Sequence, residues 1–330
     1  MKHLGGVRRL SWELLDALRH AGVDVAVDRK LDRSPLAVNS DEPSTLRRLD
    51  LQLRSAAQEL KSDGACVAHA LYYDPTSFAV RGPLVVTVYD MIHERYGTGS
   101  GLLRRTKRRV VERADAIVAI SQATADDMTT HFPLAAPVTV IHPAISATML
   151  EQPPADPRGG GVLFVGHRLR HKNFRLVLDA YRRRPDLRQR PLTLVGGTST
   201  TADERDQLGA IIGALVVHHL GVTDSLLASL YDQAAVTVVP SLWEGFGLPI
   251  IEAMARGCPV ACSAVGSMAE IASGHAQLFD PTAPDACADA IMAAATSDSD
   301  AIDAARRHAA RFNWDATARA HRDLYAALAG

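Results

Sequence analysis

The sequence has few cysteines, almost no net charge and no long apolar run, and each absence excludes a class of protein. Four cysteines in 330 residues are too few for a disulfide-stapled scaffold. A formal net charge of -1 is unlike that of a general nucleic-acid binder, so we expect no nucleic-acid partner. The longest apolar stretch, residues 211–217, is far too short to cross a bilayer. The first ten residues lack the apolar segment of a secretory signal, so we expect a soluble, cytoplasmic protein.

The composition that remains is that of a folded protein with more than one core. Hydrophobic residues make up 47% of the chain and charged residues 22%, which excludes wholesale disorder and a coiled coil. A length of 330 residues predicts two domains. Apolar strand-like runs alternate with amphipathic helix-like stretches, and this alternation is typical of parallel α/β units.

The alternation divides into two similar halves joined by a linker. Residues 151–161 hold three prolines and three glycines, and such a segment can hardly lie within a helix or strand. We therefore expect an N-terminal domain over 1–150 and a C-terminal domain over 162–311, each a doubly wound, Rossmann-like unit, facing a cleft. The expected strands are residues 23–27, 64–69, 84–89, 116–120, 138–141, 162–165, 192–195, 235–239 and 260–262. The expected helices are residues 9–21, 102–114, 122–131, 173–184 (N-capped by Asn173), 225–233, 249–256 (closed by Gly257), 285–295 and 314–328.

Residues 239–260 form the segment richest in functional residue types. A loop with Glu244 and two glycines follows a buried strand and leads to a helix that Pro249 is suited to begin. Glycines before a helix start allow a ligand close to the backbone, where free amides and the helix dipole favour a phosphate. Glu252 follows Glu244 by eight residues, so one carboxylate from the loop and one from the helix can face the same cleft and bind sugar diols. The pattern suits a nucleotide-sugar; the alternative is a strand–loop–helix turn with two solvated glutamates.

This segment resembles the E-x7-E motif of the family 4 (group 1) retaining glycosyltransferases, which have the GT-B fold. The shared string runs from Pro-Ser through Glu-Gly-Phe-Gly-Leu-Pro and Glu-Ala-Met-Ala to Gly-x-Pro-Val. The resemblance implies that Glu252 binds the nucleotide ribose and that Glu244 lies near the donor hexose. It also implies that sugar or phosphate oxygens bind the backbone amides around four loop residues, Gly245, Phe246, Gly247 and Leu248.

A basic loop after the first C-terminal strand is similar to the family segment that neutralises the donor diphosphate. Lys172 matches the family lysine that precedes an asparagine. The family arginine, where present, falls on His167 in this chain, so either Arg168 or Arg170 replaces it or the neutralisation of charge is weaker. Cationic side chains in such a loop stabilise a departing dianion, which assigns Lys172 and Arg168 a catalytic role.

Three further resemblances concern the nucleotide base and the two ends of the chain. The segment around His219 is similar to the one that contacts the base through its backbone. Residues 312–330 resemble the start and course of a helix that crosses back to the N-terminal domain. Gly5 and Gly6 resemble a glycine-rich loop that faces the donor diphosphate and, in the family, follows a first strand. Because the chain begins at this loop, we expect either a truncated start or an N-terminal domain that lacks the usual first strand.

Residues 84–93 resemble the family segment that ends in a His-Asp-Leu type of sequence. The position of the family histidine, which lies near the donor sugar, is Tyr89 here. Asp90 is retained and is a catalytic candidate, and His93, three residues further on, is either functional or structural. The group that takes the acceptor proton stays open, because the leaving phosphate can take it.

A basic helix and two patterns that suggest metal sites complete the sequence. Residues 102–113 have many basic and few acidic residues, so this helix either contacts anionic lipid or a lipid diphosphate acceptor at the inner membrane surface, or presents a solvated face. Asp298 and Asp300 follow an alanine-rich helix, and we interpret them as a loop. Cys258 and Cys262 lack a second pair of ligands for zinc. We expect no metal ion and no cofactor besides the donor substrate.

Together these features predict a retaining glycosyltransferase that moves a hexose from a nucleoside diphosphate sugar to a carbohydrate or lipid-linked acceptor. The motif strings look most like those of mannosyl- or rhamnosyl-transferring members, so GDP-mannose is the first expectation and UDP- and dTDP-sugars stay open. Surface polysaccharide assembly is favoured over natural-product glycosylation. The alternatives are a GT-B nucleotide-sugar epimerase and a degenerate glycosyltransferase that acts as a binding or scaffold protein.

Overall fold

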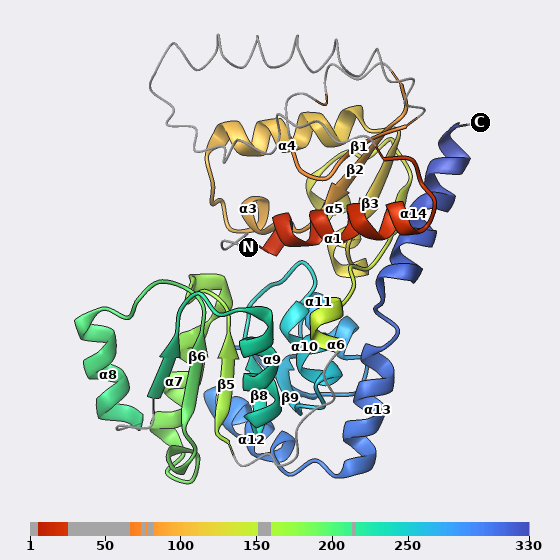
Figure 1. Cartoon of the computed structure of the whole chain (residues 1–330). Helices are drawn as coiled ribbons and strands as arrows, with labels where there is room; N and C mark the ends of the chain where they lie inside the picture. Colours follow the sequence, from red (N-terminus) through yellow and green to blue (C-terminus); the bar gives the residue numbers. More distant parts are fainter. Residues whose placement is uncertain are drawn as a thin grey trace. The chain divides into compact units, whose positions relative to one another are not determined.

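The computed structural model of the chain describes residues 6–25, 67–73, 77, 82–150, 160–212 and 216–329. These residues form two compact units (Figure 1). The N-terminal unit joins the described residues up to His142 with those from Trp314 onward, and the C-terminal unit is Pro143–Asn313. Each unit is built on a parallel sheet, so the predicted α/β class with two parallel sheets is confirmed. None of the described helices is both long enough and apolar enough to cross a bilayer.

The sheet of the N-terminal unit has its four described strands side by side in chain order, all parallel. They are β1 (Ala68–Ala70), β2 (Leu84–Val88), β3 (Ala116–Ala119) and β4 (Val138–Val140). The two central strands, β2 and β3, are buried on both faces, which explains why their sequences are apolar without alternation. Their carboxyl ends lead into α3 (Ile92–Arg95) and α5 (Gln122–His131) respectively.

Helices cover both faces of this sheet. Helix α4 (Gly101–Arg113) and α5 share a core with β2 and β3, and the hydroxyls of Ser100 and Ser121 cap their first turns. On the other face, α14 (Trp314–Ala329) packs against Val85 and Val118 and lies beside α1 (Gly6–His20) (Figure 1). The closing helix of the chain is therefore part of the N-terminal unit.

Helix α1 begins where the sequence predicted a glycine-rich loop. Gly6 is its first residue, and Gly5 lies outside the described residues. Leu10, Leu14 and Leu18 recur every four residues and are all buried, and Leu14 and Leu18 pack with Ala318 of α14. This amphipathic pattern favours a helix, which begins at Gly6 itself. The expectation that Gly6 lies in a loop is therefore wrong.

The C-terminal unit has a six-stranded parallel sheet in the order β10-β9-β8-β5-β6-β7. Its strands are β5 (Val162–Val165), β6 (Leu192–Val195), β7 (Val216–His219), β8 (Val236–Val239), β9 (Val260–Ser263) and β10 (Gln277–Phe279). The chain starts at the centre with β5, builds outward to β7, and returns to place β8 on the other side of β5. The direction of strand addition thus reverses between β5 and β8.

This reversal distributes the helices over the two faces of the sheet, because right-handed crossovers in opposite directions lie on opposite faces. One layer shares a core with the sheet and contains α7 (Phe174–Arg183), α8 (Ala202–Ile212) and α12 (Pro284–Ala294). The other layer is α9 (Asp224–Gln233) and α10 (Leu248–Ala255), with α6 (Ala147–Leu150), α11 (Gly266–Ala272) and α13 (Ser299–Ala309) packed against them. Helix α6 therefore belongs to the C-terminal unit, although its residues precede the predicted linker.

The described end of the predicted linker is bonded to the segment that joins α9 to β8. The amide of Gly160 donates to Gln233 O, and the carbonyl of Gly161 accepts from Ala235 N. A Cβ on Gly161 would collide with the carbonyl of Pro191, so only glycine allows this close backbone approach. Residues 151–159 of the linker lie outside the described residues.

Several elements differ from those predicted. The sequence missed α3, α6, α8, α11, α13 and two edge strands, β7 and β10, because their apolar patterns are short or weak. The loop interpretation of Asp298 and Asp300 is wrong, because Asp298 caps α13 through Ala301 N and Asp300 lies in its first turn. Residues 23–25 are irregular rather than a strand, and residues 26 and 27 lie outside the described part.

Two histidines meet where β1 packs near α14: His69 is half-buried on the strand and His321 is buried on the helix. His69 Nδ1 lies 2.6 Å from the hydroxyl of Tyr325, its Nε2 lies 2.8 Å from Thr87 Oγ1, and its ring stacks on that of His321 at 5.6 Å. Burial lowers the pKa of His69 well below its usual 6.5, and the neighbouring His321 lowers it further. Burial also lowers the pKa of His321. Both rings are therefore held neutral within the fold.

We expect the N-terminal unit to lose stability as the pH falls below about 6.5. The unfolded chain then takes up protons at these histidines while the folded chain does not, so the free energy of unfolding decreases. At a pH below both pKa values, a histidine whose pKa is one unit lower in the folded than in the unfolded state lowers the free energy of unfolding by about 1.4 kcal/mol. Denaturant unfolding at about pH 8 and about pH 5.5 should show this loss, and a H69Q/H321Q double variant should show less of it. An unchanged pH dependence in the double variant would contradict the assignment.

Candidate functional site

The strongest candidate site lies where the strand order of the C-terminal sheet reverses. Strands β5 and β8 are neighbours, and the loops that leave their carboxyl ends diverge toward opposite faces. In open α/β sheets ligands bind outside the carboxyl edge at this kind of switch point. The loop after β5 carries Lys172, and the loop after β8 carries Glu244.

Lys172 and Glu244 form an ion pair between these two loops. The ammonium Nζ of Lys172 lies 2.5 and 2.7 Å from the two carboxylate oxygens of Glu244. The hydroxyl of Ser241 donates to the same carboxylate at 2.6 Å. The side chain of Lys172 stays 21% exposed and that of Glu244 10%, so the pair sits at the rim of the core. Both groups can therefore reach a ligand as well as each other.

Further hydrogen bonds to backbone carbonyls hold the two loops together near this ion pair. The amide of Leu242 donates to the carbonyl of His171 at 2.7 Å. The side-chain amide of Asn173 donates to the carbonyls of Pro240 and Pro281, at 3.0 and 2.8 Å. Asn173 occupies the predicted N-cap position of α7, but its side chain makes no capping hydrogen bond: its backbone is left-handed, and the side chain binds the segments that follow β8 and β10 instead.

The loop after β8 ends at the start of α10 in the way that the sequence predicted. Gly247 precedes the helix with a φ of +99°, a conformation that favours glycine, and Leu248 and Pro249 follow as its first residues. Phe246 is buried edge-on against the ring of Phe312, 5.7 Å away, and so fixes the loop to the core. Gly245 lies between Phe246 and the paired Glu244. The backbone amides at this helix start carry the positive end of the helix dipole.

Glu252 is more deeply placed than the sequence indicated. It lies within α10, is only 5% exposed, and accepts a hydrogen bond of 3.0 Å from the hydroxyl of Tyr231 on α9. Tyr231 is itself completely buried. This bond orients the carboxylate of Glu252, which a merely solvated glutamate would not need.

Arg168 and His219 lie at the β6–β7 side of the site. Arg168 contacts Glu204, the carbonyl of Thr198 and the ring of His218, so the structure turns it away from the Lys172–Glu244 pair. His219 is the last residue of β7, and its carbonyl accepts a hydrogen bond from Gly196 N. These hydrogen bonds of Arg168 and His219 are thus to residues around β6 and β7, and none of them is to Lys172.

In the N-terminal unit, Asp90 follows the carboxyl end of the central strand β2. Its Oδ1 accepts a hydrogen bond of 3.0 Å from Ile92 N, and its other oxygen has no hydrogen bond within the described part of the chain. Tyr89, at the family histidine position, is buried with its hydroxyl 3.4 Å from Ser11 Oγ, and burial raises its pKa to about 12. Tyr89 therefore packs as a neutral phenol. His93 lies 3.1 Å from Thr98 Oγ1 at the surface.

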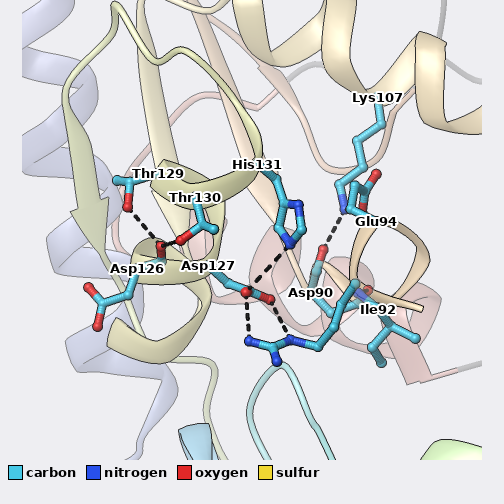
Figure 2. Close-up of polar contacts among 10 residues, drawn as sticks. Asp90, Ile92, Glu94, Lys107, Asp126, Asp127, Thr129, Thr130 and His131 are labelled. Atoms are coloured by element: carbon cyan, nitrogen blue, oxygen red, sulfur yellow. Dashed lines mark hydrogen bonds and ion pairs between the residues drawn. The ribbon is translucent and has the colours of Figure 1, made fainter. Parts of the chain in front are cut away.

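A buried polar network surrounds Asp90 that the sequence did not predict (Figure 2). Lys107, expected on the basic surface of a helix, is 1% exposed and contacts both Asp90 and Glu94. A second ion pair joins Arg95 to Asp127, at 2.9 Å. The burial of Lys107 had a signal in the sequence. Lys107 lies four residues after Leu103 and three before Val110, on the apolar face of its own helix.

Cysteine and acidic clusters offer no competing site. Cys258, Cys262 and Cys287 are free and buried, and burial raises the pKa of the Cys262 and Cys287 thiols to about 12. Within the described residues there is no group of three or more His, Cys, Asp or Glu side chains placed to hold a metal ion.

Two family descriptions together match nearly the whole chain. Residues 149–311 match Glycosyl transferases group 1, and residues 4–148 match Glycosyltransferase Family 4. The chain is 38% identical over 165 residues to the O-antigen chain mannosyltransferase B of Escherichia coli, covering 47% of this chain and 43% of that protein. It is 33% identical over 254 residues to the D-inositol 3-phosphate glycosyltransferase of Thermobispora bispora, covering 66% and 57%. The match thus spans about half the length of these two relatives.

Solved structures agree on the fold. HepE of Anabaena in complex with UDP-glucose has a TM-score of 0.76 at 18% identity, with 99% of this chain and 98% of that chain covered. Sucrose-phosphate synthase from Thermosynechococcus elongatus has a TM-score of 0.75 at 21% identity, with 98% and 94% covered. The family matches and this shared fold lead to one conclusion: the chain belongs to the family 4 (group 1) glycosyltransferases and has their GT-B fold.

Proposed function

We propose that this protein is a retaining, metal-independent hexosyltransferase that uses a nucleoside diphosphate sugar, with GDP-mannose as the first candidate donor. The observation that carries the proposal is the Lys172–Glu244 ion pair at the switch point of the C-terminal sheet, beside the Gly247 helix start. The similarity to an O-antigen chain mannosyltransferase supports mannose as the sugar and a surface polysaccharide or its lipid-linked precursor as the acceptor. The UDP-glucose complex of a fold relative makes UDP-sugars the second candidates.

The chemistry follows from the charges at this site. In sugar transfer the bond from the anomeric carbon to the diphosphate breaks, a bond to the acceptor oxygen forms, and the acceptor proton leaves, with the departing phosphate as its simplest acceptor. Negative charge grows on the diphosphate as the bond breaks. The Lys172 ammonium and the backbone amides at Phe246–Leu248 supply preorganised positive potential for that charge. This supply of positive charge is the reason that we propose a metal-independent reaction.

The carboxylates take the complementary role. Glu244, held by Lys172 and Ser241, is placed to bind hydroxyls of the donor hexose. Glu252, oriented by Tyr231, is placed to bind the ribose diol. Asp90, with one carboxylate oxygen available, is assigned to the acceptor hydroxyl. For Gly5, Gly6, Arg168 and His219, contact with the donor stays a prediction.

The direct test is a donor screen on the purified full chain. GDP-mannose, UDP-glucose and a dTDP-sugar are offered with mono- and lipid-linked saccharide acceptors, and the product anomer is read by NMR. A product with the donor's anomeric configuration supports the proposal. A donor that is converted only to another nucleotide sugar would indicate an epimerase, and a folded chain that binds but never transfers would indicate a scaffold.

Lys172→Met should lower kcat by about 10²–10³-fold, because one preorganised cation is lost from the departing diphosphate. Arg175→Met removes a cation from the first turn of α7, three residues after Lys172, but its side chain is 86% exposed, and the variant should leave kcat unchanged. Steady-state kinetics with the accepted donor measure both. Equal losses in the two variants would contradict a specific role for Lys172.

Glu252→Ala should weaken nucleoside diphosphate binding by roughly 10–100-fold, the effect of losing charge-assisted hydrogen bonds to a diol. Tyr231→Phe keeps the carboxylate and removes only its orienting hydrogen bond, so it should weaken binding by less. Isothermal titration calorimetry with the responding nucleotide distinguishes the two. Unaltered affinity in Glu252→Ala would rule out ribose binding by this residue.

We also propose a peripheral location at the inner face of the cytoplasmic membrane, with α4 as the contact. Its exposed residues include Arg105, Arg108 and Arg109, and Leu102 is 60% exposed at its start. Basic residues near an anionic surface contribute about 1 kcal/mol each. Vesicles with anionic lipid should therefore sediment the wild-type chain, and a variant with all three arginines changed to glutamine should stay in the supernatant. Equal sedimentation of both would contradict this contact.

A further inference from the structure

Lys107 is a buried cation whose contacts converge on the end of strand β2. Its side chain is 2% exposed, and its Nζ donates to the backbone carbonyl of Asp90 at 2.5 Å and to Glu94 Oε2 at 2.8 Å. The ammonium also lies 5.0 Å from the centre of the Tyr73 ring. Figure 2 shows Lys107 reaching from its helix toward Asp90 and Glu94.

The pair is poorly explained as a device for stability alone. Burying an ammonium and a carboxylate costs desolvation free energy that their attraction need not recover, and apolar residues of similar volume often do as well. Here the compensation is incomplete, because the buried Glu94 Oε1 has no hydrogen-bond partner within the described residues. A cation that binds a backbone carbonyl at a strand end, rather than a carboxylate only, instead fixes the local backbone.

The backbone that Lys107 fixes is the one that carries the Asp90 carboxylate. Asp90 is held twice: its carbonyl by Lys107 and its Oδ1 by Ile92 N, at 3.0 Å. These two bonds leave the second carboxylate oxygen without a hydrogen bond to the described residues, just after the carboxyl end of β2, the edge at which open α/β sheets bind ligands. The Arg95–Asp127 pair anchors the far end of α3 separately, so the loss of Lys107 would loosen Asp90 without releasing the whole helix.

We propose that Lys107 is a positioning residue for sugar transfer: by binding the Asp90 carbonyl and Glu94, it aims the Asp90 carboxylate at the acceptor. The inference rests on the proposed function. Lys107 itself touches neither donor nor acceptor. The residues assigned to the nucleotide, Lys172, Glu244 and Glu252, belong to the other unit, so the positioning role concerns the acceptor and leaves nucleotide binding alone.

The test compares two variants of the full chain, K107M and the double variant E94Q/K107M. K107M leaves Glu94 buried without its cation, so it should unfold at a lower temperature and transfer sugar more slowly. E94Q/K107M removes both charges and should regain most of the lost melting temperature. It should nevertheless stay roughly 10–100-fold below wild type in kcat/KM for the acceptor, because nothing holds the Asp90 carbonyl. The Kd of the nucleoside diphosphate should match that of wild type in both.

The matched control acts on the other end of the same strand. Asp115 accepts a hydrogen bond of 2.8 Å from Leu84 N, at the amino end of β2, so D115N weakens this strand without touching Asp90. It should lower the melting temperature and leave the acceptor kcat/KM unchanged.

Each outcome decides the inference. Recovery of transfer together with stability in E94Q/K107M would overturn it, since the lysine would then serve only to neutralise Glu94. A parallel loss of nucleotide affinity, or an equal loss of transfer in D115N, would overturn it as general disruption. A wild-type chain that transfers no sugar defeats the proposed function itself and the inference with it, whereas an active wild type with an active double variant defeats the inference alone.

Discussion

The ion pair between Lys172 and Glu244 is the contact on which the candidate site of the C-terminal unit depends. It joins the loops that leave β5 and β8, the two strands between which the sheet reverses its direction of growth. Opposite charges at the rim of a low-dielectric core attract more strongly than in water, but only if both loops hold their register. Asn173 and the Leu242–His171 bond provide that register from behind. In the proposed function, the same two charged groups bind the nucleoside diphosphate sugar at this edge.

The N-terminal unit uses a similar pair for a different purpose. Lys107 and Glu94 also meet at the carboxyl end of a central strand, but the lysine side chain there is 2% exposed, against 21% for Lys172. An accessible cation can neutralise a ligand, whereas a fully buried one can only hold its own protein in place. Exposure therefore separates the proposed binding role of Lys172 from the proposed positioning role of Lys107, although both are lysines that follow apolar strands.

The fold and the local geometry of the candidate site were largely predictable because their signals are local. Strand–loop–helix order, Gly247 before Pro249, and the spacing of Glu244 and Glu252 can all be read along a few residues. Long-range contacts could not be predicted: Asn173 binds carbonyls 67 and 108 residues away, and Arg168 turns to Glu204 rather than to the diphosphate loop. The burial of Lys107 was only partly predictable. The sequence places Lys107 on the apolar face of α4, but lysines are generally exposed, so the pattern was not interpreted as burial.

The measurement that tests the central assignment most directly is a thermal-shift panel of GDP, UDP, dTDP and ADP on the full chain. A nucleotide at about 100 times its Kd adds about 2.7 kcal/mol to the free energy of unfolding of the unit that binds it, which corresponds to a rise in Tm of roughly 5 °C or more. We expect one nucleotide to give this shift and the same nucleotide to give none in a Lys172→Met/Glu252→Ala double variant. A folded wild-type chain that responds to none of the four would contradict a nucleotide-sugar site at the β5–β8 switch point.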